Sequence, residues 1–313
     1  MYLGIDLGGT NIAVGLVDSG GHIIYKSSVP TLSDRRIEEI TDDIVQLCKY
    51  VTVKSGFSME KVEAVGIGCP GTIDHQKGIV VYSNNIQMNN INLCKILENK
   101  LHKPVNIEND ANAAVLGEYV VNGDNADSFI LITFGTGVGS GAILGGELYR
   151  GFNGAGCEFG HIIINADGGE QCTCGNKGCW EAYASVTALI RQTKTAMQSD
   201  NRSMMHEWIK ENGEVSGKTA FDCAKSGDKT AKAVVEQYIR YMGAGLISVL
   251  NIFQPSKILI GGGISKEGDY LLNPLCEYVY AGDYNKYREK TKIKTAVLFN
   301  DAGIIGAAMS AKE

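Results

Sequence analysis

The sequence predicts an α/β protein of two domains, and three observations support this. A chain of 313 residues is long enough for two domains of ordinary size, each with its own core. Strand-like and helix-like segments alternate along its first 120 residues, as in α/β domains. Two glycine-rich hairpins of the same pattern, at residues 3–18 and 130–146, form a rough internal repeat. The repeat indicates two domains of similar construction.

The first half of the chain supplies most of these elements. Residues 3–18 (LGIDLGGTNIAVGLVD) predict strand, tight turn and strand, because an apolar run bounded by glycines leads into an alternating run. Residues 22–29 alternate as a third strand. The helical period of residues 36–51 predicts a helix, and residues 93–101 predict another. Between these helices, residues 64–68 predict a buried strand ending in a turn at Pro70 and Gly71.

The later elements follow the same rules. Residues 105–107 predict a short strand leading into a helix that Asn109 or Asp110 can cap. The chain is largely helical by period after residue 185, with a Ser/Gly/Asp helix start in residues 226–234. Residues 257–260 predict a strand running into three glycines. The small residues of the helix predicted at 301–311 would let it pack closely against the first domain.

Composition excludes several classes of function. A net charge of −6 disfavours a nucleic-acid partner. Neither a run of 18 apolar residues nor a basic leader is present, so we expect a cytoplasmic chain without a membrane partner. An odd number of cysteines, nine in all, favours reduced thiols plus a metal cluster over disulfides.

The stretch from Glu158 to Glu181 (EFGHIIINADGGEQCTCGNKGCWE) is the most informative in the chain. Three cysteines lie close together in a glycine-rich loop, with a histidine upstream. Three thiolates and one imidazole make the closed tetrahedral shell of a structural zinc site. The predicted zinc ligands are His161, Cys172, Cys174 and Cys179. The two flanking glutamates indicate a substrate site braced by the metal; a surface staple with incidental glutamates is the alternative.

Asp110 is the strongest candidate for a catalytic base. It lies where a strand ends and a helix begins, the place where open α/β sheets bind their ligands. A carboxylate at a helix N-terminus stays ionised and can accept a proton from a hydroxyl. A plain helix cap is the alternative, but a cap needs one such residue, and Glu108, Asn109 and Asn112 lie beside it.

Three other polar residues carry weaker signals. Asp6, at the end of the first strand, could hold Mg²⁺ through water, orient a phosphate, or simply form a turn. Asn84 and Asn85 offer amides of the kind that bind sugar hydroxyls, although turns use asparagine equally. The glycine hairpins themselves would let backbone N–H groups approach a phosphate. Two such hairpins indicate a polyphosphate gripped from both sides.

Taken together, these motifs resemble the ROK family of sugar kinases, a branch of the hexokinase and actin-like ATPase superfamily. The resemblance covers nearly the whole chain and rests on DLGGTN (6–11), GCPGTID (68–74), ENDANAA (108–114), FGTGVGSG (134–141), EFGH (158–161), CTCGNKGCWEAYAS (172–185) and GGGIS (261–265). It implies the two-domain actin-like ATPase fold, a duplicated ribonuclease H-like fold with a central cleft between the domains. The smaller domain would hold residues 1–118 and 300–313, and the larger domain residues 119–299 with the zinc loop.

The resemblance also implies roles for individual residues. Asp110 would deprotonate the sugar hydroxyl. The sugar would contact Gly71, Asn85, Asn109, Asp110, Glu158, His161 and Glu181. The nucleotide would contact Asp6, Gly8, Gly9, Thr10, Asn11, Gly135, Thr136, Gly137, Gly262 and Gly263, the last two at the adenosine. His161 would place one ring nitrogen on zinc and the other on the sugar.

The implied activity is transfer of the γ-phosphate of ATP, with Mg²⁺, to a hexose. Glucose, converted to glucose 6-phosphate, is the leading substrate. N-acetylmannosamine, N-acetylglucosamine, fructose and allose are alternatives, since Met88 stands where many family members have tryptophan. A non-catalytic sugar-responsive repressor is a further alternative, but those members carry a DNA-binding helix-turn-helix ahead of the body, and here Tyr2 already starts the first strand. The resemblance also implies a homodimer.

Overall fold

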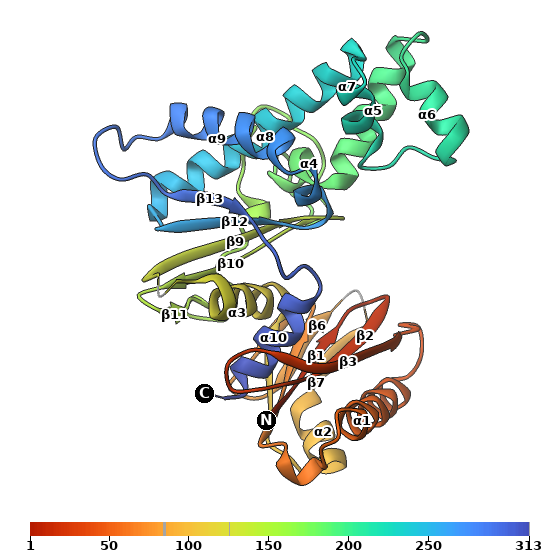
Figure 1. Cartoon of the computed structure of the whole chain (residues 1–313), viewed down its shortest axis with the longest axis vertical. Helices are drawn as coiled ribbons and strands as arrows, with labels where there is room; N and C mark the ends of the chain where they lie inside the picture. The colour runs from red at the N-terminus through yellow and green to blue at the C-terminus, as the bar shows by residue number, and fades with distance from the viewer. Residues whose placement is uncertain (84–85, 125, 313) are drawn as a thin grey trace. The chain divides into compact units, whose positions relative to one another are not determined.

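The structure is a computed structural model, and it describes residues 1–83, 86–124 and 126–312. It confirms the predicted α/β class, with two five-stranded sheets and one three-stranded sheet. The strands and helices are, in chain order (Figure 1), β1 (Tyr2–Leu7), β2 (Asn11–Val17), β3 (Ile23–Pro30), α1 (Ile37–Lys54), η1 (Met59–Lys61), β4 (Ala64–Cys69), β5 (Thr72–Asp74), β6 (Ile79–Ser83), β7 (Met88–Ile91), α2 (Leu93–Leu101), β8 (Val105–Asn109), α3 (Asp110–Asn122), β9 (Ser128–Phe134), β10 (Val138–Leu144), β11 (Glu147–Leu148), η2 (Phe159–His161), α4 (Glu181–Ala184), α5 (Val186–Ser199), α6 (Met205–Asn212), α7 (Thr219–Lys225), α8 (Lys229–Phe253), β12 (Lys257–Gly261), η3 (Gly263–Glu267), α9 (Asp269–Gly282), β13 (Lys292–Thr295) and α10 (Asp301–Ser310).

The chain divides into two compact units. Unit 1 contains residues 1–131, residues 141–157 and the chain from residue 297 onward, whereas unit 2 contains residues 132–140 and 158–296. The boundaries predicted from the sequence, after residue 118 and before residue 300, stay a prediction.

Unit 1 is built on a sheet of strand order β3-β2-β1-β4-β8. The predicted hairpin is present, because β1 and β2 pair antiparallel, with Leu7 opposite Ile12. Strands β4 and β8 run parallel to β1. The carboxyl ends of β1, β4 and β8 therefore lie at one edge of this sheet, which is the usual ligand-binding edge of an open α/β sheet.

Helix α10 packs against this sheet at backbone distance, as its small residues predict. A Cβ added to Gly66 of β4 would lie 1.7 Å from the carbonyl oxygen of Ala307, and one added to Gly306 would lie 1.6 Å from that of Ala113 in α3. Any larger side chain at these two glycines would push the helix away from its neighbours. The blue helix α10 accordingly lies beside the red strands β1 and β2 in Figure 1, with extensive contacts to β1, β4 and α3.

A three-stranded antiparallel sheet, β5-β6-β7, was not predicted from the sequence. Its strands are only three to five residues long, too short for their alternation to stand out. Gly71 precedes β5 with φ of +111°, and a Cβ there would lie 2.2 Å from the carbonyl oxygen of Tyr82. Glycine is therefore required at the turn that leads from β4 into this sheet.

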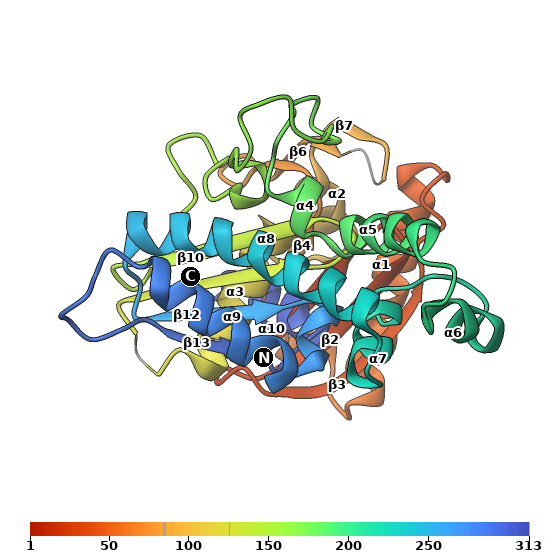
Figure 2. The ribbon, with the colours of Figure 1, turned by 90° about the horizontal axis from the view of Figure 1, so that it is seen from above.

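The second five-stranded sheet has the order β11-β10-β9-β12-β13. Unit 2 contains β12, β13 and the adjoining ends of β9 and β10. The predicted helical region after residue 185 is confirmed, and Asp228 caps α8 by accepting a hydrogen bond from the backbone N–H of Ala231. Figure 2 shows α8 and α9 side by side along this unit. Within the described ranges, no helix combines the length and apolar character that a membrane span requires.

Candidate functional site

The ligand-binding edge of the unit 1 sheet carries two carboxylates. Asp6 is the penultimate residue of β1, and Asp110 follows β8 directly as the first residue of α3. The helix begins there because the side chain of Asn109 accepts hydrogen bonds from the backbone N–H groups of Ala111 and Asn112. Asn109, one of the two predicted caps, is thus the N-cap, which leaves the Asp110 carboxylate available at the sheet edge.

The pKa values of both carboxyl groups are raised. Burial raises the pKa of Asp6 to about 6, and the negative charge of Asp110 adds to this shift. Part of the Asp110 side chain is open to solvent, yet the loss of surrounding water still raises its pKa, against the opposing effect of the hydrogen bond donated by the Ala111 N–H. A raised pKa brings a carboxylate closer to the range useful for accepting a proton at neutral pH.

Replacing Asp6 with asparagine is expected to stabilise the protein at pH 7. Because the folded-state pKa lies above the ordinary value of 3.8, the folded chain binds more protons than the unfolded chain between about pH 4 and pH 6. The free energy of unfolding therefore falls as the pH rises through this window. Removing the charge should raise that free energy at pH 7 by on the order of 1–3 kcal/mol. Urea unfolding at several pH values measures this.

The control for this experiment is Asp34→Asn, which removes a carboxylate that is exposed to solvent. The Asp6→Asn effect should shrink toward zero near pH 4, where the native carboxyl group is protonated. An equal stabilisation at pH 4 and pH 7, or a loss of stability at pH 7, would contradict the charge argument.

The neighbours of Asp110 are held by polar contacts within unit 1. The amide nitrogen of Asn109 donates to the carbonyl oxygen of Gly71 at 3.1 Å, so the two predicted sugar contacts are joined directly. Glu108 is buried and forms an ion pair with Arg150, with 2.7 Å between Nε and Oε2. Asn112 is also buried, on α3. Arg150 could not be predicted as a partner of Glu108, because it lies 42 residues further along the chain.

The first glycine hairpin is stabilised by a residue that the motif does not contain. The N–H of Gly8 donates to the carbonyl oxygen of Asn11, which closes the turn that also holds Gly9 and Thr10. The hydroxyl of Thr31 donates to the carbonyl oxygen of Gly8 at 2.6 Å, and its N–H donates to that of Thr10. Thr31 is fully buried, and its two hydrogen bonds hold the turn between β1 and β2 in place.

The second glycine hairpin meets two other segments in unit 2. The N–H of Gly135 donates to the carbonyl oxygen of Gly137, which forms the turn. At the start of α5, Thr187 donates its hydroxyl to the carbonyl oxygen of Thr136 at 2.8 Å. Gly262, with φ of +84°, packs so closely that a Cβ would lie 2.1 Å from the carbonyl oxygen of Phe134. The structure thus brings the predicted nucleotide residues of unit 2 together, with Gly263 next in the chain.

The four predicted zinc ligands converge. The ligand atoms of His161, Cys172, Cys174 and Cys179 all lie within 4.8 Å of one another. The Cys174 and Cys179 sulfurs are 3.6 Å apart, and Nδ1 of His161 lies 3.6 Å from the Cys172 sulfur. Zn–S and Zn–N bonds of about 2.3 and 2.0 Å require tetrahedral edges of about 3.8 and 3.5 Å.

The chemistry of these donors fits a divalent cation as well as their spacing does. Burial raises the pKa of Cys179 to about 12, whereas the hydrogen bond from the backbone N–H of Asn176 lowers that of Cys174. Three thiolates can coexist in such a space only with a cation to neutralise them. Sulfur and imidazole donors in a tetrahedron favour zinc, so the cluster suggests a zinc site.

Glu181 joins the zinc loop to the second glycine hairpin. Its Oε2 accepts the backbone N–H of Val138 at 2.9 Å, and a Cβ on Gly137 would lie 2.3 Å from that oxygen. Its Oε1 accepts the hydroxyl of Thr173 at 3.2 Å and lies 3.7 Å from the sulfur of Cys172. Glycine is thus needed at position 137 to leave room for this carboxylate.

The other end of the zinc loop also contacts β10. The N–H of Phe159 donates to the hydroxyl of Ser140, and a Cβ on Gly160 would lie 2.3 Å from the carbonyl oxygen of Val138. Glu158 precedes this turn and accepts the N–H of His161 on its carbonyl oxygen. The turn therefore fixes Glu158 and His161 on the same strand end that Glu181 contacts.

Trp180 anchors the zinc loop in the core of unit 2, a role that the sequence analysis missed. It is fully buried, donates its indole N–H to the carbonyl oxygen of Tyr241 at 2.7 Å, and meets Phe134 edge to face. A large aromatic residue directly before Glu181 was the signal in the sequence that could have predicted this role.

Three residues of the predicted sugar-side segment remain. Met88, which stands where many family members have tryptophan, is buried in the core of unit 1. Asn84 and Asn85 lie outside the described residues.

Comparison with known proteins identifies the family. The family model described as ROK family matches residues 2–313. A glucokinase of Halalkalibacterium halodurans is 34% identical, over 100% of this chain and 95% of its own. The crystal structure of a ROK family glucokinase from Streptomyces griseus, in complex with glucose and AMPPNP, is 36% identical with a TM-score of 0.83 and 99% of both chains covered. The xylose repressor of Bacillus subtilis is 30% identical, over 97% of this chain and 75% of its own. The chain therefore belongs to the ROK family and has the actin-like ATPase fold of the ROK glucokinase structures.

Proposed function

We propose that this protein is an ATP-dependent hexose kinase whose leading substrate is glucose, converted to glucose 6-phosphate. The observation that carries the proposal is Asp110, a carboxylate of raised pKa at the ligand-binding edge of a ROK fold. Full-length similarity to glucokinases supports glucose over other hexoses. The glucose and AMPPNP bound in the Streptomyces griseus structure support the same pair of substrates here.

Asp110 is the proposed general base. Its carboxylate accepts the proton of the attacking sugar hydroxyl as the new oxygen–phosphorus bond forms and the bond to the ADP leaving group breaks. The N–H of Ala111 donates to its Oδ1 at 2.9 Å and so orients the carboxylate. Such a base contributes about 10²–10⁴-fold to the rate.

The glycine hairpins are the proposed phosphate-binding elements. Backbone N–H groups around Gly8–Thr10 and Gly135–Gly137 would donate to phosphate oxygens, where negative charge spreads in the transition state. Mg²⁺, when bound with ATP, supplies further positive charge to these oxygens. Asp6, at the end of β1, would hold the ion through water, and Gly262 and Gly263 would contact the adenosine.

Polar groups of the predicted site are the proposed partners of the sugar hydroxyls. They are Asn85, Asn109 and the Gly71 turn, together with Glu158, His161 and Glu181. Because Nδ1 of His161 faces the sulfur of Cys172, its other ring nitrogen is available as a donor to a sugar oxygen. The zinc ion would hold these side chains in position without taking part in the chemistry.

An ADP-release assay tests the proposal. The protein with ATP and Mg²⁺ should release ADP when glucose is added, and more slowly with mannose, fructose, allose, N-acetylglucosamine or N-acetylmannosamine. A higher kcat/KM for one of the other sugars would replace glucose as the substrate but keep the kinase. Turnover with none of them would overturn the proposal in favour of a sugar-binding regulator, a reading that the similarity to the xylose repressor supports.

A further inference from the structure

The two glycine hairpins share a form of support that lies outside their own residues. Each tip, residues 8–10 in unit 1 and residues 135–137 in unit 2, is held by the hydroxyl of a threonine from elsewhere in the chain. Neither threonine, Thr31 nor Thr187, belongs to a motif that predicted the site. The same support therefore occurs in both halves of the internal repeat.

The supported atoms are carbonyl oxygens of the tips. Thr31 donates its hydroxyl to the carbonyl oxygen of Gly8 at 2.6 Å, and Thr187 donates its hydroxyl to that of Thr136 at 2.8 Å. A backbone N–H of each supporting segment, that of Thr31 and that of Val186, donates to a second tip carbonyl. These bonds direct the carbonyl oxygens, whose negative partial charge would repel a phosphate, toward the supporting segments.

The direction of each tip carbonyl also sets the direction of an N–H group. A trans peptide unit is planar, so the C=O of one residue and the N–H of the next point in opposite directions. The part of the chain that the structure describes contains no cis peptide bond. The hydroxyl of Thr31 therefore aims the N–H of Gly9, and the hydroxyl of Thr187 aims the N–H of Gly137.

The two N–H groups that are aimed in this way remain available to a ligand. Among residues 1–83, 86–124 and 126–312, neither the N–H of Gly9 nor that of Gly137 donates a hydrogen bond. Both glycines are partly exposed to solvent. Backbone N–H groups left free in turns of this kind bind phosphate oxygens.

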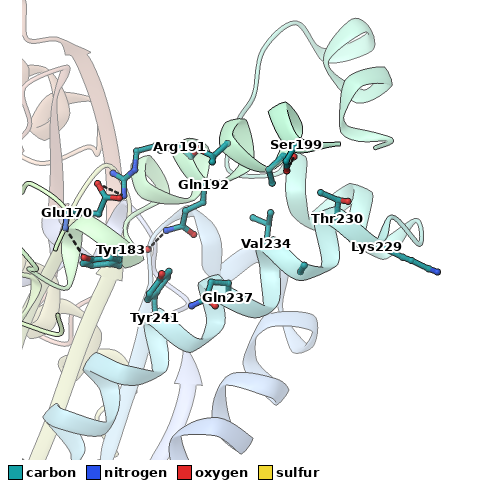
Figure 3. Close-up of a pocket in the computed structure, with 13 residues that line it drawn as sticks. Glu170, Tyr183, Arg191, Gln192, Ser199, Lys229, Thr230, Val234, Gln237 and Tyr241 are labelled. Carbon is teal, nitrogen blue, oxygen red and sulfur yellow. Dashed lines mark hydrogen bonds and ion pairs between the residues drawn. The ribbon is translucent and has the colours of Figure 1, made fainter. Parts of the chain in front are cut away.

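The segment that carries Thr187 is firmly attached to the helix before it. Gln192 of α5 donates from Nε2 to the carbonyl oxygen of Tyr183 in α4 at 2.9 Å, and Figure 3 shows it reaching back to that residue. Arg191 donates to the carbonyl oxygen of Ala182 at 2.7 Å. These bonds fix the first turn of α5, and with it the hydroxyl of Thr187.

The segment that carries Thr31 is attached to α1 in a similar way. The guanidinium of Arg35 donates from Nη2 to the carbonyl oxygen of Thr31 at 2.8 Å and to Oδ2 of Asp43 at 2.7 Å. Thr31 is fully buried, so water does not compete for its hydroxyl. Both threonines therefore belong to the fixed scaffold around the hairpins.

We propose that Thr31 and Thr187 are positioning residues for the phosphate groups of the nucleotide, one for each hairpin. Each hydroxyl fixes a tip carbonyl, so that the following N–H is directed at a phosphate oxygen before the nucleotide binds. A donor fixed in advance costs no reorganisation when negative charge develops in the transition state. The inference rests on the proposed function, in which these hairpins bind the phosphates of ATP.

NMR titrations of protein with isotope-labelled glycine, using adenosine and AMPPNP with Mg²⁺ as probes, test the proposal. Thr31→Val and Thr187→Val keep the size of the side chain but remove the hydroxyl. Each should weaken the Kd for AMPPNP about three- to tenfold and leave the Kd for adenosine unchanged. The shift that AMPPNP causes in the N–H signal of Gly9 should shrink in Thr31→Val, and that of Gly137 in Thr187→Val. Serine at either position restores the hydroxyl and should restore the affinity.

Thr52→Val and Thr195→Val are the matched controls. Each threonine donates its hydroxyl to a backbone carbonyl oxygen away from the hairpins, Thr52 at 2.8 Å and Thr195 at 3.1 Å. Thr52 is fully buried like Thr31, and Thr195 is exposed like Thr187. Both control variants should bind AMPPNP as tightly as the wild type does.

Wild-type affinity for AMPPNP in the folded valine variants would overturn the proposal, as would an equal loss of adenosine affinity or an equal loss in the controls. Thr187→Val decides the result if the buried Thr31→Val does not fold. A wild-type protein that binds no AMPPNP would overturn both this inference and the hexose kinase proposal. Binding of AMPPNP without turnover in the ADP-release assay would overturn the kinase proposal alone.

Discussion

Replacing Asp110 with asparagine is expected to lower kcat about 10²–10⁴-fold while the Kd for the sugar changes little. Asparagine keeps the size and polarity of the side chain but cannot accept the proton of the attacking hydroxyl. The fold should be unaffected, because the side chain of Asn109, and not that of Asp110, caps α3. Steady-state kinetics and sugar binding by calorimetry separate the two quantities.

Asp74→Asn is a suitable control for this variant. Asp74 also ends a strand of unit 1 but forms an exposed ion pair with Lys77, so its replacement should leave kcat unchanged. Wild-type turnover in Asp110→Asn would refute the assignment of the base. A parallel loss of sugar affinity and turnover would instead make Asp110 a binding residue.

Removing one zinc ligand is expected to release the metal and loosen the loop. Cys174 is the exposed cysteine of the cluster, so Cys174→Ser changes packing least. The metal content should fall from about one zinc per chain toward zero. A metal held at 1,000 times its Kd stabilises a folded chain by about 4 kcal/mol, so the melting temperature should fall. Elemental analysis and hydrogen exchange over residues 158–181 measure the two effects.

Cys276→Ser is the matched control, since Cys276 is a half-buried thiol outside the cluster. Sugar affinity should weaken in Cys174→Ser, because Glu181 and His161 lose their support. Nucleotide affinity should weaken as well, because Glu181 holds the backbone of Val138 beside the second glycine hairpin. Full sugar affinity in a zinc-free protein would show that the metal does not shape the site.

The parts of the fold that could be predicted are those with a strong local signal. Glycine hairpins, the Asp228 cap and the small residues of α10 each act over a few positions, and the structure shows all of them where the sequence placed them. The β5-β6-β7 sheet could not be predicted, because strands of three to five residues are too short to show a clear alternation of apolar and polar residues. Its stability depends on the pairing of separate segments, which cannot be seen in the sequence of any one of them.

The candidate site divides in the same way. The convergence of His161, Cys172, Cys174 and Cys179 was predictable because the spacing of a histidine and three cysteines is typical of a metal site. Thr31, Thr187 and Arg150 were not, since each supports a motif from a distant place in the chain. The hydrogen bond between Glu181 and the N–H of Val138 could not be predicted for a similar reason. The motif shows a carboxylate beside cysteines, but only the fold brings Val138 close to it.

The packing of α10 has a consequence for the order in which the protein forms. During synthesis, β1, β4 and α3 leave the ribosome long before residues 301–310. Until that helix arrives, the glycine-lined surface of these elements has no partner, because only a backbone can approach it so closely. Unit 2 residues, by contrast, are all translated by residue 296. The N-terminal unit therefore begins first and is completed last, and its apolar sheet face is exposed to chaperones and proteases throughout elongation.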